Sequence, residues 1–227
     1  MIEFSHTSGS SQKTPPPYPV CTGSLLPVRI EPLDRQKKKV FLEDGTVLHL
    51  YNSEIRTFEL QEYTILEGDA YTELMQRLCK RARARAMHLL KNADRPSTEI
   101  ARKLQTNGYP EEAIADAVAY LLHYGYIDDT AYIQRYFAAN KNKKSRQQIR
   151  FDLLRKGLDT ELVDDSLAEE ESDSDTEAAL LLLQKYCRNK DAADPAVRQK
   201  AFAYLMRRGF SMSDIQHVYE EYDKLNL

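Results

Sequence analysis

The feature that most constrains the fold is an internal repeat aligned on Gly108, Gly157 and Gly209. These glycines lie 49 and 52 residues apart, and periods near this length are typical of arrays of helical units. An apolar residue stands four residues before, one residue after and six residues after each glycine: Leu104, Tyr109 and Ile114; Leu153, Leu158 and Val163; Leu205, Phe210 and Ile215.

The spacing within each unit predicts helix, glycine turn, helix. Apolar residues four apart share one helix face, and glycine tolerates the left-handed conformation that ends many helices. A further helix precedes each unit, at about 70–92, 129–140 and 176–190. No unit buries its apolar face alone, so neighbours must stack. We therefore expect a mainly α fold, an elongated and curved array of three tandem three-helix, helix-turn-helix-like repeats.

The N-terminal part of the chain has a different pattern. Residues 1–27, rich in Ser, Thr, Gly and Pro, are predicted to form a disordered tail. Asp44-Gly45 between two apolar segments predicts a small hairpin, which should pack on the next part of the chain. The predicted domains are the tail (1–27), a β element (28–68) and helical repeats 1 (69–127), 2 (128–171) and 3 (172–227).

Helix starts are also readable. Asp69 is a candidate N-cap for the first long helix, and Asp128 or Asp129 can cap the helix that carries Ile133. Ser145-Arg146-Gln147-Gln148 fits a capping box, and Asp194-Pro195 offers an N-cap followed by proline at the first helical position.

Charge is segregated along the chain although the net charge is only -3. Residues 77–103 carry nine basic side chains, residues 135–156 carry eight, and residues 159–177 carry ten acidic and no basic ones. We call the first two segments the first and second basic blocks. Such blocks can face phosphate or an acidic protein. The candidate partner- or DNA-binding residues are Arg77, Lys80, Arg81, Arg83, Arg85, Lys141, Lys143, Lys144, Arg146, Arg150, Arg155 and Lys156.

Each of these features also has a plainer interpretation. The basic blocks can be solvated helix faces, although Arg77, Arg81 and Arg85 share one face, where like charges cost stability and a neutralising partner is expected. The acidic segment is read as a solvated linker, with pairing to a basic block as the alternative. The tyrosines of residues 120–136 can stack on bases or pack between helices. Charge reversal at Arg81 and Arg85 is expected to weaken partner binding and leave helicity intact.

Residues that would carry chemistry are not arranged as a site. The sequence contains no phosphate-binding loop, no dinucleotide fingerprint and no HExxH, and the five histidines are scattered. Cys21, Cys79 and Cys187 form no CxxC pair, which predicts reduced thiols in the cytoplasm. No apolar stretch is long enough to span a membrane. We expect a non-enzymatic protein without cofactor or metal, and a monomer.

Three segments resemble signatures of the RecX family. The segment 124–132, Tyr-Gly-Tyr-Ile-Asp-Asp-Thr-Ala-Tyr, is similar to the one that joins the first two repeats. Residues 97–109 resemble the first-repeat signature S-x-x-E-L-x-x-K-L-x-x-x-G, with Glu99 two rather than three residues after Ser97. Residues 153–158, Leu-Leu-Arg-Lys-Gly-Leu, resemble the second-repeat signature L-x-x-K-G-[IL]. The resemblance covers about 28–224.

The resemblance implies three tandem three-helix repeats and a regulator of the RecA recombinase. It implies binding in the groove of the RecA–single-stranded-DNA filament, with limits on filament growth, ATPase, strand exchange and coprotease activity. The family offers no catalytic residues to carry over. The proline-rich tail, the acidic segment and the degenerate third repeat depart from the family pattern, which bears on how the third repeat docks.

Two other kinds of protein fit the same sequence. Helix, glycine turn, helix is also the plan of a helix-turn-helix protein that binds single- or double-stranded DNA without RecA. Its affinity for DNA would fall steeply with salt. A generic helical scaffold would be indifferent to both DNA and RecA.

Overall fold

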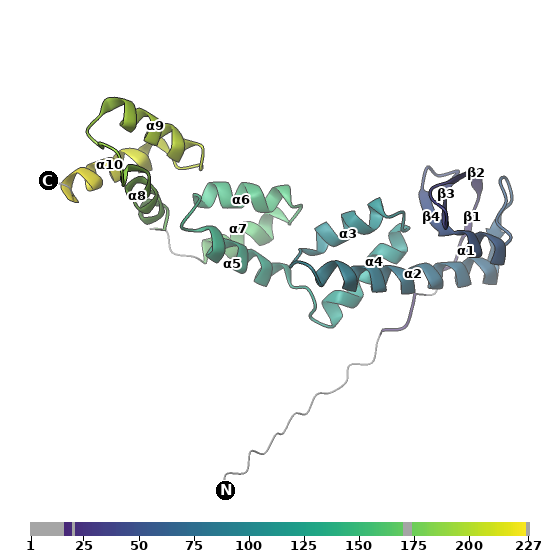
Figure 1. Ribbon diagram of the computed structural model, residues 1–227. Coiled ribbons are helices and arrows are strands. Elements are labelled where there is room, and N and C mark those ends of the chain that lie inside the picture. Colours follow the sequence, from purple (N-terminus) through teal and green to yellow (C-terminus); the bar gives the residue numbers. More distant parts are fainter. Residues whose placement is uncertain (1–15, 20, 170–173, 226–227) are drawn as a thin grey trace, which may run out of the picture. The chain divides into compact units, whose positions relative to one another are not determined.

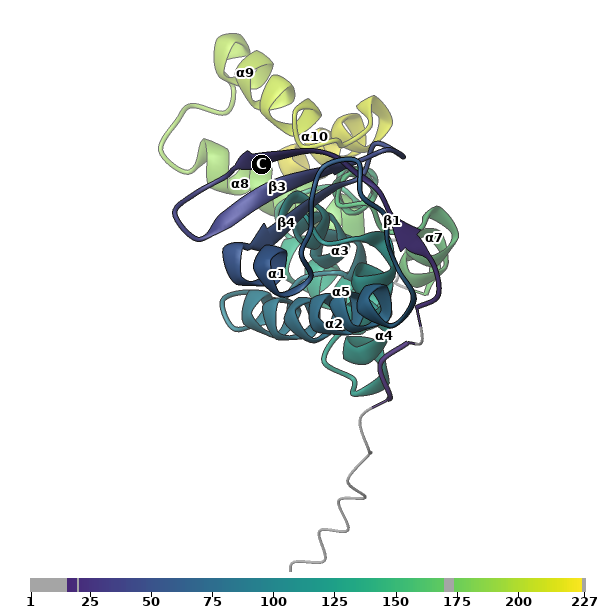
Figure 2. The same cartoon turned by 90° about the vertical axis from the view of Figure 1, so that its right-hand side faces the viewer.

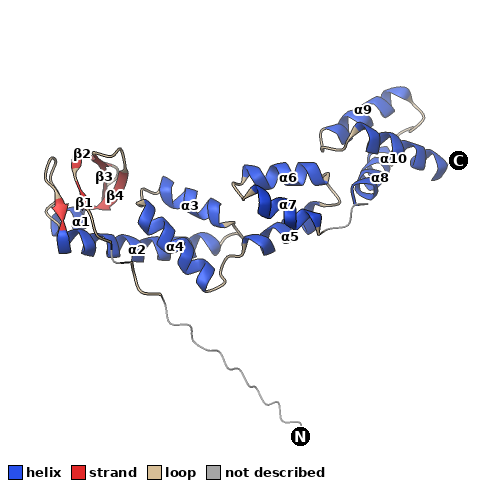
Figure 3. Ribbon diagram, turned by 180° about the vertical axis from the view of Figure 1, so that it is seen from behind, coloured by secondary structure: helices blue, strands red, loops and turns tan. Residues whose placement is uncertain are grey.

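The computed structural model describes residues 16–19, 21–169 and 174–225. The chain divides into two compact units. Unit 1 holds the described residues up to Ala93 together with Ile100–Ile127, and unit 2 holds Asp94–Glu99 together with the described residues from Asp128 onward. Every strand in the described ranges lies in unit 1, whereas both units contain several helices (Figures 1 and 3).

Unit 1 begins with a three-stranded antiparallel sheet rather than a hairpin alone. Its strands, in the order β2-β3-β4, are β2 (Pro27–Pro32), β3 (Lys37–Leu42) and β4 (Val47–Tyr51). The predicted turn joins β3 to β4, where Gly45 has φ +85° and the Asp44 carboxylate accepts a hydrogen bond from Thr46 N–H (2.8 Å). The sheet lies beside helix α1 (Asn52–Thr57), as Figure 2 shows. A third strand gives the hairpin the support that two strands lack in water.

The predicted disordered tail must be shortened at its end nearest the sheet. Ser24–Leu25 form strand β1, which pairs antiparallel with β5 (Leu66–Glu67). Cys21 and Leu25 are buried in the core of unit 1, and Thr72 Oγ1 donates a hydrogen bond to the Cys21 carbonyl (3.0 Å). These buried apolar contacts offset the entropy lost when the segment is ordered. Residues 1–15 of the predicted tail lie outside the described residues.

In the described ranges, nine further helices form three groups of three, which confirms the predicted mainly α fold of three-helix repeats. The first group is α2 (Gly68–Leu90), α3 (Ser97–Thr106) and α4 (Glu111–His123). The second is α5 (Asp129–Asn140), α6 (Arg146–Arg155) and α7 (Thr160–Ala168). The third is α8 (Ser174–Cys187), α9 (Pro195–Met206) and α10 (Met212–Leu225). No helix within the described ranges is both long and apolar enough to cross a membrane.

The repeat positions predicted from the glycines supply the cores. Leu104, Leu153 and Leu205 are fully buried. They belong to three separate clusters of apolar side chains, one in unit 1 and two in unit 2, around α5–α7 and α8–α10. The three glycines have φ of +71°, +90° and +85°, as the predicted turns require. Each group of helices therefore has an apolar centre of its own.

Most predicted helix starts are confirmed. Asp128 caps α5 through Ala131 N–H, and Asp194 caps α9 with Pro195 in its first turn. Ser145 caps α6 by accepting from Gln148 N–H, but the reciprocal bond of the predicted capping box is not formed, because Ser145 N–H donates to the Arg208 carbonyl. The prediction of Asp69 as the N-cap of α2 is wrong. The N-cap is Glu67 and the helix begins at Gly68, so Asp69 lies in its first turn, where an acidic side chain is favoured by the helix dipole.

In unit 2, the start of one helix rests on the glycine turn of the next group. Ser145 N–H donates to the Arg208 carbonyl (3.1 Å), and a Cβ added at Gly209 would lie only 2.6 Å from Ser145 Oγ. Asp175, in the first turn of α8, accepts a hydrogen bond from Arg146 N–H (2.8 Å). We call this arrangement of Ser145, Arg146, Asp175, Arg208 and Gly209 the second joint.

The start of α3 makes the equivalent contacts. Thr98 Oγ1 donates to the Lys156 carbonyl (3.2 Å), next to Gly157, and Asp129 accepts from Ser97 N–H (2.8 Å). We call this set of residues the first joint. Its contacts explain why residues 94–99 belong to unit 2 although the rest of α3 belongs to unit 1.

Candidate partner-binding surface

Arg81 of the first basic block is a structural residue in unit 1. Its guanidinium binds the Glu54 carboxylate (2.6 Å) and the His49 carbonyl (2.7 Å). It also lies 4.8 Å from the Tyr51 ring centroid and 5.3 Å from that of Tyr109. Glu54 is buried, so the pair ties α2 to α1 and β4. Charge reversal at Arg81 would place two carboxylates together, so we now expect it to lower the stability of unit 1 as well as to affect partner binding.

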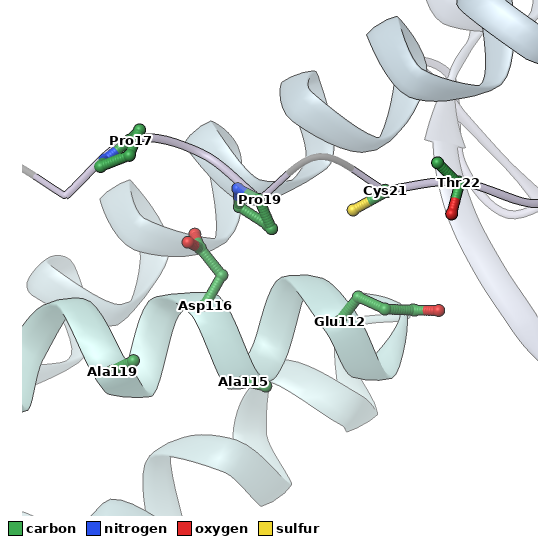
Figure 4. A pocket seen from close by; sticks show the side chains of 8 residues that line it. All are labelled: Pro17, Pro19, Cys21, Thr22, Glu112, Ala115, Asp116 and Ala119. Carbon is green, nitrogen blue, oxygen red and sulfur yellow. The ribbon is translucent and has the colours of Figure 1, made fainter.

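Arg83 is still more enclosed. Its Nε and Nη2 atoms bind the two oxygens of Asp116 on α4 at 2.7 and 2.5 Å, and the two side chains are 7% and 8% exposed. This bidentate hydrogen bonding raises the pKa of the Arg83 guanidinium further above its usual range. Figure 4 shows Asp116 directed from α4 toward the segment that carries Pro17 and Pro19. Arg83 is therefore enclosed between Asp116 of α4 and residues 16–18.

The remaining candidates of the first block lie nearer to water. Arg77 pairs with Glu73 one turn earlier (2.6 Å), and Arg85 Nε donates to the Asn107 side chain (3.0 Å). Lys80 is exposed, and its side chain makes no ion pair or hydrogen bond with any residue that the structure describes. In the row formed by Arg77, Arg81 and Arg85, the first two are therefore neutralised by carboxylates within the chain, whereas Arg85 has only a neutral amide as its hydrogen-bond partner.

Several cations of the second basic block are paired with carboxylates. Lys144 Nζ lies 2.6 Å from Asp152, Arg150 binds Asp164 through two bonds of 2.5 and 2.9 Å, and Lys156 Nζ lies 3.7 Å from Glu99. Burial opposes the ionisation of Asp152, but hydrogen bonds from Lys144 and Gln148 outweigh it and lower the pKa of this carboxyl. Arg146 donates to the Leu167 carbonyl (2.7 Å).

Three other cations of the second block, Lys141, Lys143 and Arg155, are exposed. Lys143 Nζ donates to the Ala139 carbonyl (2.9 Å). The side chains of Lys141 and Arg155 make no hydrogen bond or ion pair with residues in the described ranges. Like the first block, in which Arg77, Lys80, Lys91 and Arg102 are exposed, the second block thus keeps several cations at the surface.

A pocket in unit 2 collects part of this charge. It lies between α6 and α9, has a volume of about 410 Å³, and is lined by Lys144, Gln148, Asp152, Tyr204, Arg207 and Arg208. Three of these side chains are cations and one is a carboxylate. Arg207 is exposed, and Arg208 Nη1 donates to the Lys143 carbonyl (2.7 Å) while its guanidinium lies 4.5 Å from the Tyr204 ring centroid. We call this site the basic pocket.

Arg207 and Arg208 are not among the residues predicted from the sequence. They precede Gly209 as Arg155 and Lys156 precede Gly157, so the repeat alignment itself carries the signal. Charge density along the chain does not reveal them, because only two basic residues occur together there. The second joint brings them to the basic block, since Ser145 binds the Arg208 carbonyl directly before α6.

The described part of the acidic segment contacts the second block. Asp164 pairs with Arg150, and Asp175 accepts from the backbone of Arg146. Burial raises the pKa of the Asp175 carboxyl. These two contacts agree with the pairing that was the alternative to a solvated linker, whereas residues 170–173 of the segment lie outside the described residues.

Groups suited to metal or nucleophilic chemistry are not assembled in the described ranges. No cluster there brings together three His, Cys, Asp or Glu side chains that could hold a metal ion. Cys21, Cys79 and Cys187 are free and buried. Burial raises the pKa of the Cys79 thiol to about 12, which opposes formation of a nucleophilic thiolate.

The fold and the surface together define a protein built from three-helix repeats, with a basic pocket between the second and third. Residues 82–121 match the family model of the first three-helix domain of RecX, and residues 173–219 match that of the third. The chain belongs to the RecX family.

Curated relatives agree with this assignment. The chain is 28% identical over 126 residues to a regulatory protein RecX of Clostridium botulinum, a match that spans 54% of this chain and 59% of the relative's length. It is 23% identical to the regulatory protein RecX of Clostridioides difficile, with 86% of this chain and 98% of that protein covered.

A solved structure shares the fold. A crystal structure of a regulatory protein RecX superposes with a TM-score of 0.55 at 25% identity, covering 88% of this chain and 99% of that one. A second, of RecX from Lactobacillus salivarius, has a TM-score of 0.57 at 22% identity and covers 65% and 97% of the two chains.

Proposed function

We propose that this chain regulates the RecA recombinase by binding the RecA–single-stranded-DNA filament in the cytoplasm, and thereby limits filament growth and ATPase activity. It acts by binding and not by catalysis. Membership of a family of regulatory proteins supports this proposal. The structural observation on which it mainly rests is the basic pocket with its exposed Arg207. The three free cysteines agree with a reducing compartment.

The chemistry of the pocket suits such a filament. Guanidinium groups bind phosphate and carboxylate oxygens through paired hydrogen bonds, and a nucleoprotein filament offers both. Lys144 is already paired with Asp152, so Arg207 and the free face of Arg208 are the groups that would meet the partner. Lys141 and Arg155 supply further exposed positive charge in the same unit.

The test is the single-stranded-DNA-dependent ATPase of RecA, with this protein added below the RecA concentration. Inhibition at such ratios is expected for a regulator that acts at few sites on each filament. Reversing the charges with Lys141→Glu and Arg207→Glu should raise the half-inhibiting concentration at least about tenfold, since each exposed contact to a charged partner is worth about 1 kcal/mol or more.

Lys80→Glu is the matched control, because Lys80 is equally exposed but lies in the first basic block. It should inhibit like the wild type. Equal inhibition by the wild type and the Lys141→Glu, Arg207→Glu double variant would exclude the basic pocket from the interface. No inhibition by the wild type would contradict the proposed function.

A second function, DNA binding without RecA, is favoured by one observation. Tyr204 lines the basic pocket beside Arg208, and aromatic rings among cations are typical of surfaces that bind unpaired bases. Fluorescence anisotropy with a single-stranded oligonucleotide decides between the two. Binding that is tight without RecA and falls steeply with salt, together with an unchanged RecA ATPase, would favour this second function.

A further inference from the structure

A short N-terminal segment, here called the strap (residues 16–19), contacts the side chain of Arg83 in unit 1. Arg83 Nη1 donates to the Pro16 carbonyl (3.0 Å) and Nη2 to the Pro17 carbonyl (3.4 Å). The Tyr18 ring centroid lies 4.3 Å from the same guanidinium. The strap thus offers main-chain oxygens and one aromatic ring, and Tyr18 stays 37% exposed.

The surface beneath the strap is fixed by contacts that do not involve it. Asp116 holds Arg83 through two hydrogen bonds, so the remaining donors of the guanidinium point outward in a set geometry. The Tyr120 ring lies on Arg83 as well, at 4.9 Å. Tyr120 is in turn packed against Tyr124 (4.8 Å between ring centroids). Two helices therefore present a preformed aromatic and cationic surface.

These features match the way extended proline-rich segments are recognised. Such segments keep their backbone carbonyls free and lose little entropy on binding, and they dock on grooves lined by aromatic rings. Here Arg83 donates hydrogen bonds to two successive proline carbonyls. Its guanidinium contacts the ring of Tyr18 from the strap and the ring of Tyr120 from α4. The recognition depends on extended backbone and proline, not on a particular long sequence.

The strap does not fill the surface on which it lies. A groove of about 580 Å³ runs between it and α4, lined by Pro17, Pro19, Cys21, Thr22, Glu112, Ala115, Asp116 and Ala119. Figure 4 shows Ala115 and Ala119 on the helix below and Pro17 and Pro19 on the strap above. The small alanine side chains leave room for a second chain segment to enter before the strap leaves.

We propose that this surface of α2 and α4 is a binding site for an extended, proline-rich segment of another protein, and that the strap occupies it in cis. An attached segment competes at an effective concentration in the millimolar range, so a partner must displace it. The site lies in unit 1 and goes beyond the proposed function, which uses the basic pocket of unit 2. Its partner would be recruited independently of the filament.

The test uses a fluorescein-labelled peptide with the sequence of residues 14–20 (Thr-Pro-Pro-Pro-Tyr-Pro-Val) and the full-length chain. Anisotropy should show weak binding to the wild type and about tenfold tighter binding to Tyr18→Ala, because loss of one cation–π contact weakens the strap in cis. Adding Tyr120→Ala to Tyr18→Ala should abolish the gain. Leu122→Ala, which changes a half-exposed residue on the same helix, is the control and should bind like the wild type.

Three results would overturn the proposal. The first is equal affinity of wild type and Tyr18→Ala for the peptide, and the second is binding that survives Tyr120→Ala. The third is a concentration-dependent dimer of the wild type that Tyr18→Ala dissociates, since a second copy would then be the occupant. Should Tyr18→Ala fail to fold, a peptide with a photo-crosslinking residue in place of its tyrosine can be used on the wild type. It should label α4 between residues 112 and 120, and labelling elsewhere contradicts the site.

Discussion

The two basic blocks have similar charge in the sequence and different fates in the structure. In the first, Arg81 and Arg83 are bound by Glu54 and Asp116, carboxylates far away in the chain. In the second, the paired cations Lys144 and Arg150 are 31% and 40% exposed, and Arg207 and Arg208 of the next group of helices line a pocket with Lys144. A dense basic segment therefore indicates a binding surface only after the carboxylates that fold onto it have been counted.

The largest effect should come from Arg83→Ala. It leaves the nearly buried Asp116 carboxylate without its partner, which typically costs about 3–5 kcal/mol. Chemical denaturation followed by circular dichroism measures the loss. Replacing both side chains, with Arg83→Met and Asp116→Leu, should restore much of the stability, because no charge is then left unpaired. A loss below about 1 kcal/mol for Arg83→Ala would show that the enclosed pair of the first block does not stabilise the fold.

Gly209→Ala tests how the second block acquires its neighbours. The alanine must adopt φ +85°, and its Cβ would meet Ser145 Oγ. We therefore expect the free energy of unfolding to fall by about 2–3 kcal/mol, because of backbone strain and a weakened helix cap. Gly125→Ala is the matched control, since Gly125 also has positive φ but open space around it, and should cost about 1 kcal/mol. Equal losses in thermal denaturation would mean that the second joint contributes nothing.

Arg77→Ala should have a small effect. Arg77 is 46% exposed, and its pairing with Glu73 one helical turn away is worth about 0.3–0.5 kcal/mol. Comparing its urea midpoint with that of Arg83→Ala measures the difference in stability between an exposed and an enclosed cation of the same block. A loss as large as that of Arg83→Ala would contradict the division into enclosed and surface members.

The smallest effect concerns the pH dependence near the first block. Partial burial, with Lys39, Lys37 and Arg81 nearby, lowers the pKa of His49, so the folded chain resists protonation more than the unfolded chain. The stability that His49 contributes is therefore lost as the pH falls below its unfolded value of about 6.5. His49→Gln should lose less stability than the wild type between pH 7 and about 5.5. Parallel profiles for the two proteins would exclude His49 as a contributor.

Local and periodic features of the fold could be predicted from the sequence. The glycine spacing, the buried leucines and the caps at Asp128, Ser145 and Asp194 depend on neighbours within a few residues, and the structure confirms them. Residues of β2 lie in the predicted β element, but the turn signal at Asp44-Gly45 does not specify that β2 pairs with β3 as a third strand.

The candidate surface was predictable only in part. Nothing near Arg83 in the sequence indicates Asp116, which lies on another helix 33 residues away. Arg207 could have been predicted, because it stands two residues before Gly209 as Arg155 stands two residues before Gly157. Whether a cation is exposed or enclosed depends on pairing with carboxylates far away in the sequence. The sequence has no periodic pattern at those positions, so it does not reveal this pairing.

The second joint has a consequence for the order in which the chain is made. The start of α6 depends on Asp175 and on the turn at Gly209, which leaves the ribosome about sixty residues after Ser145. The second group of helices thus emerges with one end of its middle helix unfinished. Its final form is reached only when the third group has been synthesised. A chain truncated before the third group would contain a second group of helices without the contacts of the second joint. We expect that end of the truncated chain to be cleaved by proteases.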